Sequence, residues 1–326
     1  MAATIADVAR LAGCSITTVS RAYSAPEKVR EQTRLRIARA AEALHYSPNA
    51  IARAMVRQRN NNLAFVVDPK HYPIMINPFY AEMAEAVQQE AEARGYYVYI
   101  TASNHRDLFM KKRVDGVVLA GQIDQALLAS LRSQGMPVVQ TNNRPEHGDI
   151  PSIISDDYQG TVQAMEHLIG RGHTRIGLLA GRLQPYISEI RYQAYCDVLA
   201  RHGLPFRADD ICEVEPCQED ACAAADALLA RPDRPTALFC MNDRIAIGAM
   251  KAALRRGMRI PEELAVMGYD GSSLCTVIEP ELTSVRVDIE EIGRRSAQIL
   301  IDLIEEKPVG PVQIVVQPRL ALRATP

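Results

Sequence analysis

The chain has 326 residues, of which 48% are hydrophobic and 23% are charged. This composition is typical of a soluble globular protein, and the length allows two or more domains of roughly 150 residues each. Apolar runs such as Val117–Ala120 are far shorter than the ~20 residues that span a bilayer, and residues 1–30 lack the apolar segment of a secretory signal. The sequence thus excludes a membrane-spanning protein and indicates a cytoplasmic one.

The net charge of −2 is divided unevenly along the chain. Residues 1–62 contain ten Lys and Arg side chains against four Asp and Glu, a net charge of +6, which leaves −8 for the remainder. A basic head on an acidic body indicates that the head binds a polyanion. A solvated helical surface is the alternative that charge alone leaves open.

The cysteines give no sign of a metal site. There are seven of them at scattered positions, which fits a reducing compartment where disulfides are rare. Cys212, Cys217 and Cys222 recur every five residues, but no CxxC pair or nearby His completes a set of ligands. We expect neither a metal nor another cofactor.

Residues 4–23, TIADVARLAGCSITTVSRAY, predict two short helices joined by a tight turn. Thr4 begins the first helix in a sequence that resembles a capping box, and Gly13 ends it because glycine adopts left-handed backbone angles readily. Ser15 caps the second helix. A third helix is expected over about Val29–His45. Its apolar side is predicted to consist of Leu35, Ile37, Ala38, Ala41 and Leu44.

Two helices with such a turn form a helix-turn-helix, whose second helix enters the major groove of DNA with its N-terminal residues at the base edges. Those residues here are Ile16 and Thr17, with Arg21 one turn further along. Arginine bonds guanine bidentately, whereas the Ile side chain and the Thr methyl group suit a thymine methyl group. The pattern predicts DNA reading, although any small helical hairpin can have this spacing.

The segment YSPN (residues 46–49) interrupts the helical pattern. The residues after it, AIARAMVRQRNNN, have helical propensity but little apolar surface, and residues 47–61 are assigned to a separate segment. A helix of this length is unstable alone in water. We therefore expect a hinge helix that becomes ordered on DNA, with a plain linker as the alternative.

From Leu63 onward, short apolar runs alternate with amphipathic helical stretches. The alternation predicts parallel sheets covered by helices, and two such series within about 260 residues predict two lobes with a cleft between them. The helices are expected over residues 79–94, 123–134, 158–171, 188–202, 219–230 and 243–256.

Polar residues follow several of the predicted strands. Asn142, Asn242, Asp243 and Asp270 stand at these positions. Ligands of open α/β sheets bind beyond the carboxyl ends of the strands, so these side chains are candidates for binding a small polar ligand. Each one can equally be a helix cap, and Asn242 and Asp243 suit that role well.

The opening stretch together with YSPNAIARAM resembles the lactose-repressor (LacI/GalR) family of bacterial transcription regulators. Further blocks resemble the ligand-binding core of that family, in the same order: RVDGVVLAG, SDDYQGTVQAMEHLIGRGHTRIGLLAG, FCMNDRIAIGAMKAALRRGMRIPEELAVMGYDG and PELTSVRVDIEEIG. The resemblance implies an N-terminal all-α helix-turn-helix domain (1–46), a hinge helix or linker (47–61) and a two-lobed α/β core like a periplasmic binding protein, with parallel sheets (62–326). The chain is then expected to cross between the lobes near residues 155, 287 and 312.

The function implied by this resemblance is that of a homodimeric repressor of a catabolic operon. Its affinity for a near-palindromic double-stranded DNA operator would be controlled by a small effector, for which a sugar or sugar derivative is the first candidate and a nucleoside the second. A co-repressor-dependent regulator and an activator have the same sequence pattern, so both alternatives stay open.

The resemblance also implies the residues of each site. The residues expected to contact DNA are Thr4, Ser15, Ile16, Thr17, Thr18, Ser20, Arg21, Thr33, Asn49 and Met55. The residues expected to contact the effector are Phe79, Tyr80, Ala120, Asn142, Arg191, Phe239, Asn242 and Asp270. Arg191 stands where the family has an arginine that clamps the ligand, with a surface ion pair as the alternative.

The sequence departs from the family pattern in places. Met55 replaces a leucine that wedges into the minor groove, and methionine is also an apolar wedge that kinks DNA. The chain has no Trp, and residues 101–113 are too few for the usual second helix of the first lobe. Residues 70–76 look like a small insertion. The last two changes border the expected cleft, so the effector is not identified by the resemblance.

Two other classes of protein fit the sequence less well. An enzyme is disfavoured because the sequence contains no GxxxxGK[ST], GxSxG, HExxH or GxGxxG motif, and we expect no catalytic residues. A solute-binding protein for transport would suit the clamp, but the absent signal peptide and the basic head argue against it.

We predict that Arg21→Ala weakens operator binding by ~1–3 kcal/mol and relaxes the preference at one base pair, because a base-reading arginine is lost. Binding to a library of operator variants measures both effects. An unchanged sequence preference would remove Arg21 from the residues that read bases.

Overall fold

The computed structural model describes residues 3–24, 28–46, 60–69, 74, 77–104, 113–122, 124–143, 148–181, 185–215, 217–310 and 313–326. The chain divides into two compact units, Met1–Asn62 with Asp107–Asp115, and Leu63–Arg106 with Gly116–Pro326. The division after Asn62 lies one residue from the expected start of the core. Among the described helices, none has the length and apolar character needed to cross a membrane.

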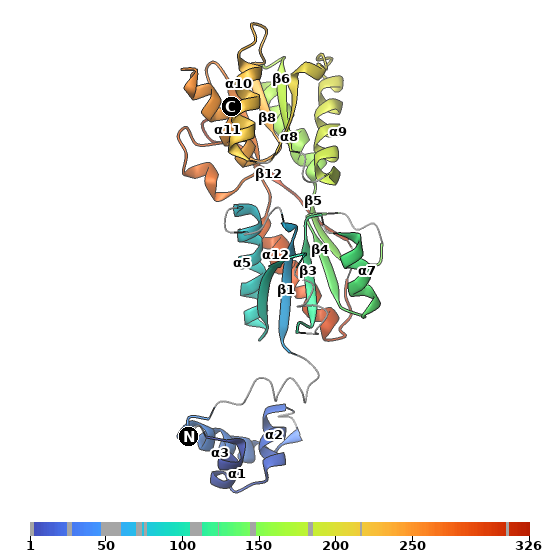
Figure 1. Ribbon diagram of the computed structural model, residues 1–326, viewed down its shortest axis with the longest axis vertical. Coiled ribbons are helices and arrows are strands. Elements are labelled where there is room, and N and C mark those ends of the chain that lie inside the picture. Colours follow the sequence, from blue (N-terminus) through green and yellow to red (C-terminus); the bar gives the residue numbers. More distant parts are fainter. Residues whose placement is uncertain are drawn as a thin grey trace. The chain divides into compact units, whose positions relative to one another are not determined.

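The first unit contains α1 (Ile5–Leu11), α2 (Ile16–Ser24) and α3 (Glu31–Ala43), shown in blue in Figure 1. The three helices bury a small apolar core of their own, which consists of Val8, Ala9, Ala12, Val19, Ile37, Ala40 and Ala41. This arrangement confirms the predicted helix-turn-helix followed by a third helix.

Local hydrogen bonds explain where these helices begin. Thr4 and Asp7 form a capping box, in which the Asp7 backbone N–H donates to the Thr4 side chain and the Thr4 backbone N–H donates to Asp7. The Ser15 hydroxyl accepts from the backbone N–H of Thr18 at 3.0 Å. Gly13 adopts a φ of +61° in the turn between the helices. All three roles agree with the sequence prediction.

The apolar side of α3 differs in part from the prediction. Ile37 and Ala41 are buried as expected, but Leu35 is 54% exposed and Ala38 is also exposed. Residues three and four apart share one face of a helix, so Ile37, Ala40 and Ala41 lie together while Leu35 lies on another side. Assigning Leu35 and Ala38 to the core was wrong.

The second unit consists of two lobes, each built on a sheet of six strands whose order in the sheet differs from their order in the chain (Figure 1). The first lobe contains β1 (Asn62–Val67), β2 (Tyr97–Ala102), β3 (Gly116–Ala120), β4 (Val138–Thr141), β5 (Ser152–Ser155) and β11 (Gln313–Val316), with α5 (Pro78–Ala93), α7 (Gln125–Ser133) and α12 (Ile289–Ile304). Its strand order is β11-β5-β4-β3-β1-β2.

The second lobe contains β6 (Ile176–Gly181), β7 (Ile211–Val214), β8 (Ala237–Cys240), β9 (Ala265–Asp270), β10 (Ser284–Arg286) and β12 (Arg319–Ala321), with α8 (Asp157–Gly170), α9 (Pro185–Arg201), α10 (Gln218–Leu229) and α11 (Asp243–Arg255). Its strand order is β12-β10-β9-β8-β6-β7. Short 3₁₀ turns lie at η4 (Ala208–Asp210) and η5 (Ser273–Thr276).

Strand pairing confirms the predicted parallel sheets. The pairs β1–β3, β3–β4, β4–β5, β5–β11, β6–β7, β6–β8, β8–β9 and β9–β10 are parallel. The edge pair β10–β12 is antiparallel. Parallel sheets are covered by helices on their faces, and the central strands β1, β3 and β8 are accordingly buried along nearly their whole length.

The chain passes between the lobes after β5, after β10 and after β11. The first two passages agree with the positions expected near residues 155 and 287. The third lies between Val316 and Arg319 rather than at 312, because β11 continues in the first lobe up to Val316. The expected truncated helix and insertion fall mainly on residues 105–112 and 70–76, which apart from Ile74 lie outside the described residues.

We predict that Gly293→Ala destabilises the protein by about 1–3 kcal/mol because it overpacks the contact between α5 and α12. A Cβ atom at Gly293 would lie 2.6 Å from the carbonyl oxygen of Met83 and 2.8 Å from the Cβ of Ala86. Gly170→Ala is the control, since nothing lies within 4 Å of its added Cβ. That helical substitution should be neutral or stabilise by up to ~1 kcal/mol. Equal effects in denaturant unfolding would contradict the packing argument.

Candidate functional sites

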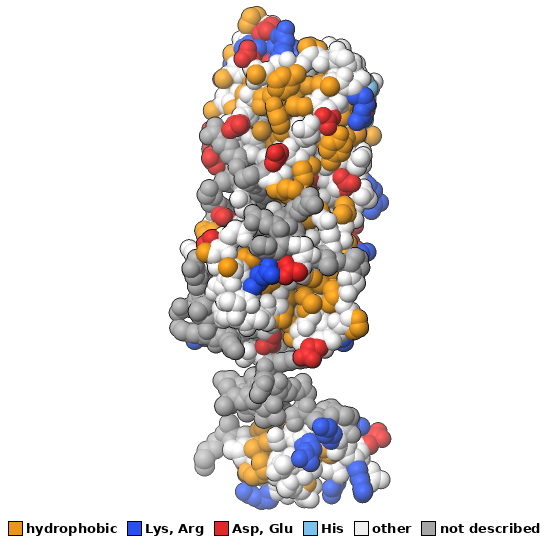
Figure 2. Space-filling model, turned by 90° about the vertical axis from the view of Figure 1, so that its right-hand side faces the viewer, with side chains coloured by type: hydrophobic (Ala, Val, Ile, Leu, Met, Phe, Trp, Pro, Cys, Tyr) orange, Lys and Arg blue, Asp and Glu red, His pale blue; other side chains and the backbone are white. Residues whose placement is uncertain are grey.

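The N-terminal half of α2 presents side chains to solvent. Ile16 is 51% exposed, and Thr17 and Arg21 are also exposed, whereas Val19 on the opposite side is fully buried. Figure 2 shows Lys and Arg side chains gathered on the visible face of this unit. A rigid helix with exposed apolar and basic groups, held by its buried face, has the geometry of a recognition helix.

The other residues predicted to contact DNA have varied surroundings. The Thr4 and Ser15 side chains serve as caps, and the Ser15 and Thr18 hydroxyls lie 2.8 Å apart. Ser20 and Thr33 are half-buried. Asn49 and Met55, and with them the predicted hinge helix, lie outside the described residues.

A pocket of about 740 Å³, counted with its open mouth, lies between the two lobes of the second unit. Its lining residues come from the start of α5, the residue after β4, the end of β6, the first half of α9, the loops after β8 and β9, and the start of α11. They are Asn77, Pro78, Phe79, Tyr80, Asn142, Gly181, Ile187, Ser188, Arg191, Met241, Asn242, Asp243, Arg244, Asp270 and Ser272. The structure therefore brings together six of the eight residues predicted to bind the effector.

Arg191 is the centre of the charged wall of this pocket and is only 5% exposed. Its Nε and Nη2 atoms donate to Oδ1 of Asp157 at 2.9 and 2.6 Å, and Nη1 donates to the carbonyl oxygen of Met241. The guanidinium lies over the ring of Tyr269 at 3.4 Å from its centroid. The surface ion pair considered as an alternative is therefore excluded, since Arg191 is buried.

Asp270 is the second acidic residue near Arg191. Its Oδ1 lies 3.8 Å from Nη2 of the arginine, and its side chain is 18% exposed. Burial raises the pKa of Asp270 well above its ordinary value of 3.8, although the charge on Arg191 opposes this rise. For Arg191 itself, burial works to lower the pKa, but Asp157, Tyr269 and Asp270 together outweigh burial and the pKa is raised.

Asp243 is a second buried carboxylate in the pocket wall. It accepts from the backbone N–H and the hydroxyl of Ser272 at 2.7 and 2.8 Å, and from the hydroxyl of Ser284 at 2.5 Å. Burial raises the pKa of Asp243 against these hydrogen bonds. Its position at the start of α11 ties the loop after β9 to that helix, which is a structural role.

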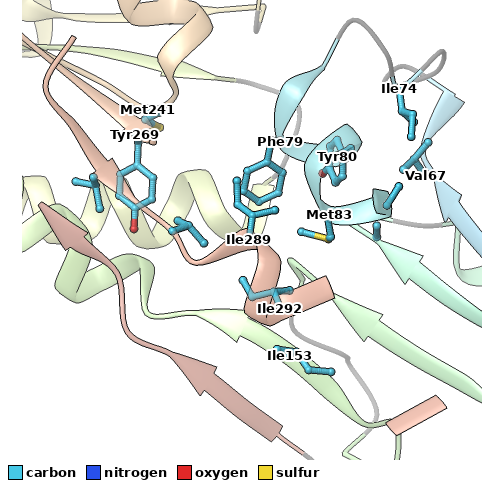
Figure 3. Close-up of a cluster of buried hydrophobic side chains, with 14 of the residues drawn as sticks. Val67, Ile74, Phe79, Tyr80, Met83, Ile153, Met241, Tyr269, Ile289 and Ile292 are labelled. Atoms are coloured by element: carbon cyan, nitrogen blue, oxygen red, sulfur yellow. The ribbon is translucent and has the colours of Figure 1, made fainter. Parts of the chain in front are cut away.

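The first lobe contributes a neutral wall. Phe79 and Tyr80 pack edge to face, with ring centroids 5.3 Å apart. Asn142, at a φ of +54°, donates from Nδ2 to the Tyr80 hydroxyl at 3.3 Å. Figure 3 shows Phe79 beside Ile289, on the side of Tyr269 and Met241, whereas Tyr80 lies toward Val67 and Ile74.

Asn242 has the cap role that the sequence left open. Its side-chain oxygen accepts from the backbone N–H of Ile245 at 2.8 Å, which caps α11, and the same residue lines the pocket. Capping uses the carbonyl oxygen, so the two roles are compatible.

Two of the predicted effector residues are not brought to the pocket. Ala120 at the end of β3 and Phe239 in β8 are fully buried, and neither is among the described residues that line it. Phe239 pairs with Leu178 and Met267 on the flanking strands. A ring in the middle of a central strand is covered by the helices on the sheet face, so it cannot reach the strand ends.

The sequence predictions did not include Ser188 and Ser272, which line the pocket, or Asp157, which lies behind the pocket wall and binds Arg191. A signal for Asp157 was present, since SDDYQG places two acidic residues at the start of a helix directly after a strand. Its pairing with Arg191, 34 residues away, was not visible in the sequence. Among the described residues, no group of His, Cys, Asp and Glu is arranged to hold a metal ion.

Comparisons with known proteins agree with this geometry. Residues 4–49 match the family described as "Bacterial regulatory proteins, lacI family", and residues 165–325 match "Periplasmic binding protein-like domain". The chain is 31% identical to the HTH-type transcriptional repressor PurR of Mannheimia succiniciproducens over 98% of both chains. The chain belongs to the LacI family of bacterial regulatory proteins.

Other members of the family are similarly close. The HTH-type transcriptional repressor CytR of Escherichia coli K12 is 32% identical, over 95% of this chain and 92% of CytR. The structure of the transcriptional regulator CelR in complex with cellobiose is similar over 99% of this chain and all of CelR, with a TM-score of 0.76 and 29% identity. Similarity over nearly full length places both the helix-turn-helix and the two-lobed core within the LacI family.

We predict that Asp270→Asn stabilises this LacI-family protein at neutral pH. The raised pKa of Asp270 means that the folded state holds its proton more tightly than the unfolded chain, so the free energy of unfolding falls as the pH rises from the ordinary pKa of 3.8 toward the raised pKa. The gain in the free energy of unfolding should be small near an ordinary pKa of 3.8 and should increase toward neutral pH.

Denaturant unfolding of wild type and variant across this pH range measures the difference. Asp209→Asn at an exposed carboxylate is the control and should change the free energy of unfolding by no more than about 0.5 kcal/mol throughout. A gain from Asp270→Asn that shrinks with rising pH would contradict the argument.

Proposed function

We propose that this protein is a sequence-specific transcription repressor of a catabolic operon, and that a small effector in the interlobe pocket controls its affinity for the operator. The observation that carries the proposal is the combination in one chain of an exposed, basic recognition helix with a polar pocket between two lobes. Membership of the LacI family, and relatives named as transcriptional repressors, support the same function.

DNA reading is assigned to α2. Ile16 and Thr17 would contact base edges and Arg21 a guanine, while backbone-directed contacts come from the other predicted DNA-binding residues. Asn49 and Met55 are proposed to act in the hinge, with Met55 as an apolar wedge in the minor groove. Two copies of the chain, as a homodimer, would read two half-sites of a near-palindromic operator.

The effector is proposed to be a sugar or sugar derivative, with a nucleoside as the second candidate. The pocket offers amide, hydroxyl and guanidinium donors around a few apolar side chains, which suits a ligand rich in hydroxyl groups. CelR, whose structure contains cellobiose, is a relative with a sugar ligand. Such a ligand contacts both lobes and therefore favours one arrangement of them over the other.

Three alternatives to an inducible repressor are a regulator with the opposite response to its ligand, a transport protein and an enzyme. Co-repression or activation uses the same two sites with the opposite sign of coupling. A transport protein would have no use for an exposed basic recognition helix. Catalysis is not part of the proposal, because the acidic side chains that line the pocket already have partners: Asp270 pairs with Arg191, and Asp243 accepts from the hydroxyls of Ser272 and Ser284.

We predict that selection from random double-stranded DNA recovers a near-palindrome, and that a thermal-shift screen of sugars, sugar acids and nucleosides finds a stabilising ligand. At a hundredfold its dissociation constant, a ligand adds ~2.7 kcal/mol to the free energy of unfolding. That ligand should then change binding to the selected operator.

Arg191→Lys is the matched variant, because lysine keeps a positive charge beside Asp157 but lacks the planar fork and the ring stacking. It should bind the operator normally and lose the ligand response. A normal ligand response in this variant would refute the role of Arg191, and failure to select any DNA sequence would refute the proposed repressor.

A further inference from the structure

The surroundings of Arg191 define the charge that the pocket presents to a ligand. An arginine in a ligand pocket often pairs with a carboxylate or phosphate of the ligand. Here the protein supplies its own carboxylates, from Asp157 at 2.6 Å and from Asp270 at 3.8 Å. Asp157 is 6% exposed and is not among the residues that line the pocket, so it acts on a ligand only through Arg191.

We propose that Asp157 makes the pocket select effectors that carry no negative charge. With its charge balanced by Asp157, Arg191 acts as an oriented donor to hydroxyl or carbonyl oxygens rather than as the partner of an anion. The inference rests on the proposed function and names the chemical class of the effector, a neutral polyhydroxylated molecule. Asp157 is a positioning residue, since it holds Arg191 and does not touch the ligand.

The hydrogen bonds of Arg191 support this assignment. Nε donates to Asp157, and Nη1 and Nη2 each use one N–H on Met241 and Asp157. Each terminal nitrogen has a second N–H, which is not donated to any described residue. The orientation of these remaining donors is set by Asp157 on one side and by the Tyr269 ring on the other.

Adding an anion to this cluster would place a second negative charge beside a guanidinium that Asp157 already balances. In a site shielded from water, like charges repel strongly because the local dielectric is low. The acidic side chains of Asp243 and Asp270 in the same wall offer no positive charge that would offset that repulsion. A neutral hydroxyl group accepts the same hydrogen bonds without this cost.

Arg244 is the residue that argues for the opposite preference. It lies in the first turn of α11, lines the pocket and forms no ion pair with any described residue. Arg244 is half-buried, so solvent and salt weaken its attraction for an anion compared with the buried cluster. The experiment therefore includes this residue.

The test compares ligands in pairs that differ by one anionic group, namely glucose with glucuronate, galactose with galacturonate, ribose with ribose 5-phosphate, and cytidine with cytidine monophosphate. Calorimetric titration of the full chain gives the ratio of affinities within each pair. We expect every pair that binds to favour the neutral member by about tenfold or more. An anionic ligand that binds better than its neutral partner would overturn the proposal. If Arg244→Gln then abolished that preference for the anionic ligand, the preference would be assigned to Arg244.

Asp157→Asn is the second arm, because the amide keeps an oxygen for Arg191 but removes the charge. We expect the ratio within each pair to shift toward the anionic member by about tenfold. Asp197→Asn is the control, since Asp197 bonds Tyr158 and Gln193 away from the pocket. A ratio that does not move in Asp157→Asn would overturn the proposal, and a structural defect alone would weaken both members equally.

Operator binding without ligand is measured on the same proteins. Loss of DNA selection in the wild type would count against the proposed repressor and not against the ligand preference. An anionic preference with intact operator binding would count against the ligand preference alone.

Discussion

The buried guanidinium of Arg191 is the constraint around which the second lobe's half of the pocket is arranged. A charge that is removed from water must be paired and hydrogen-bonded inside the protein. The partners come from three separate places: the first residue of α8, the carbonyl group after β8 and the ring at the end of β9. Two of these points lie where the parallel strands β8 and β9 end, and the third follows the passage of the chain from β5 into the second lobe.

The two lobes contribute different chemistry to the pocket. The first lobe supplies Phe79, Tyr80 and Asn142, which are neutral, while the second supplies the buried charges. The passages between the lobes start close to this chemistry, since Asp157 follows β5 by two residues. Arg191, which Asp157 holds, therefore lies directly beside a connection between the lobes.

The helix-turn-helix unit is built on a different principle. Its small core is closed by short side chains and its helix starts are held by local caps. Ile16, Thr17 and Arg21 lie on the exposed face of α2 and take no part in this core. The large core carries the ligand chemistry, and the division of the chain after Asn62 keeps the two tasks apart.

Much of this organisation was readable in the amino-acid order. The caps at Thr4 and Ser15 and the turn at Gly13 follow from residues within a few positions of each other, as do the alternating strands and helices of the core. The pocket at the strand ends also follows, because parallel strands align their carboxyl ends. The resemblance to a known family placed Arg191 in that pocket.

The tertiary structure alone decided which side chains meet. Asp157 pairs with Arg191 across 34 positions, and Tyr269 donates to the Asp157 carbonyl oxygen across 112. It also buried Phe239 within a central strand, away from the pocket. Local patterns report the periodicity of one element, whereas these contacts depend on how several elements pack, and no spacing in the chain encodes that.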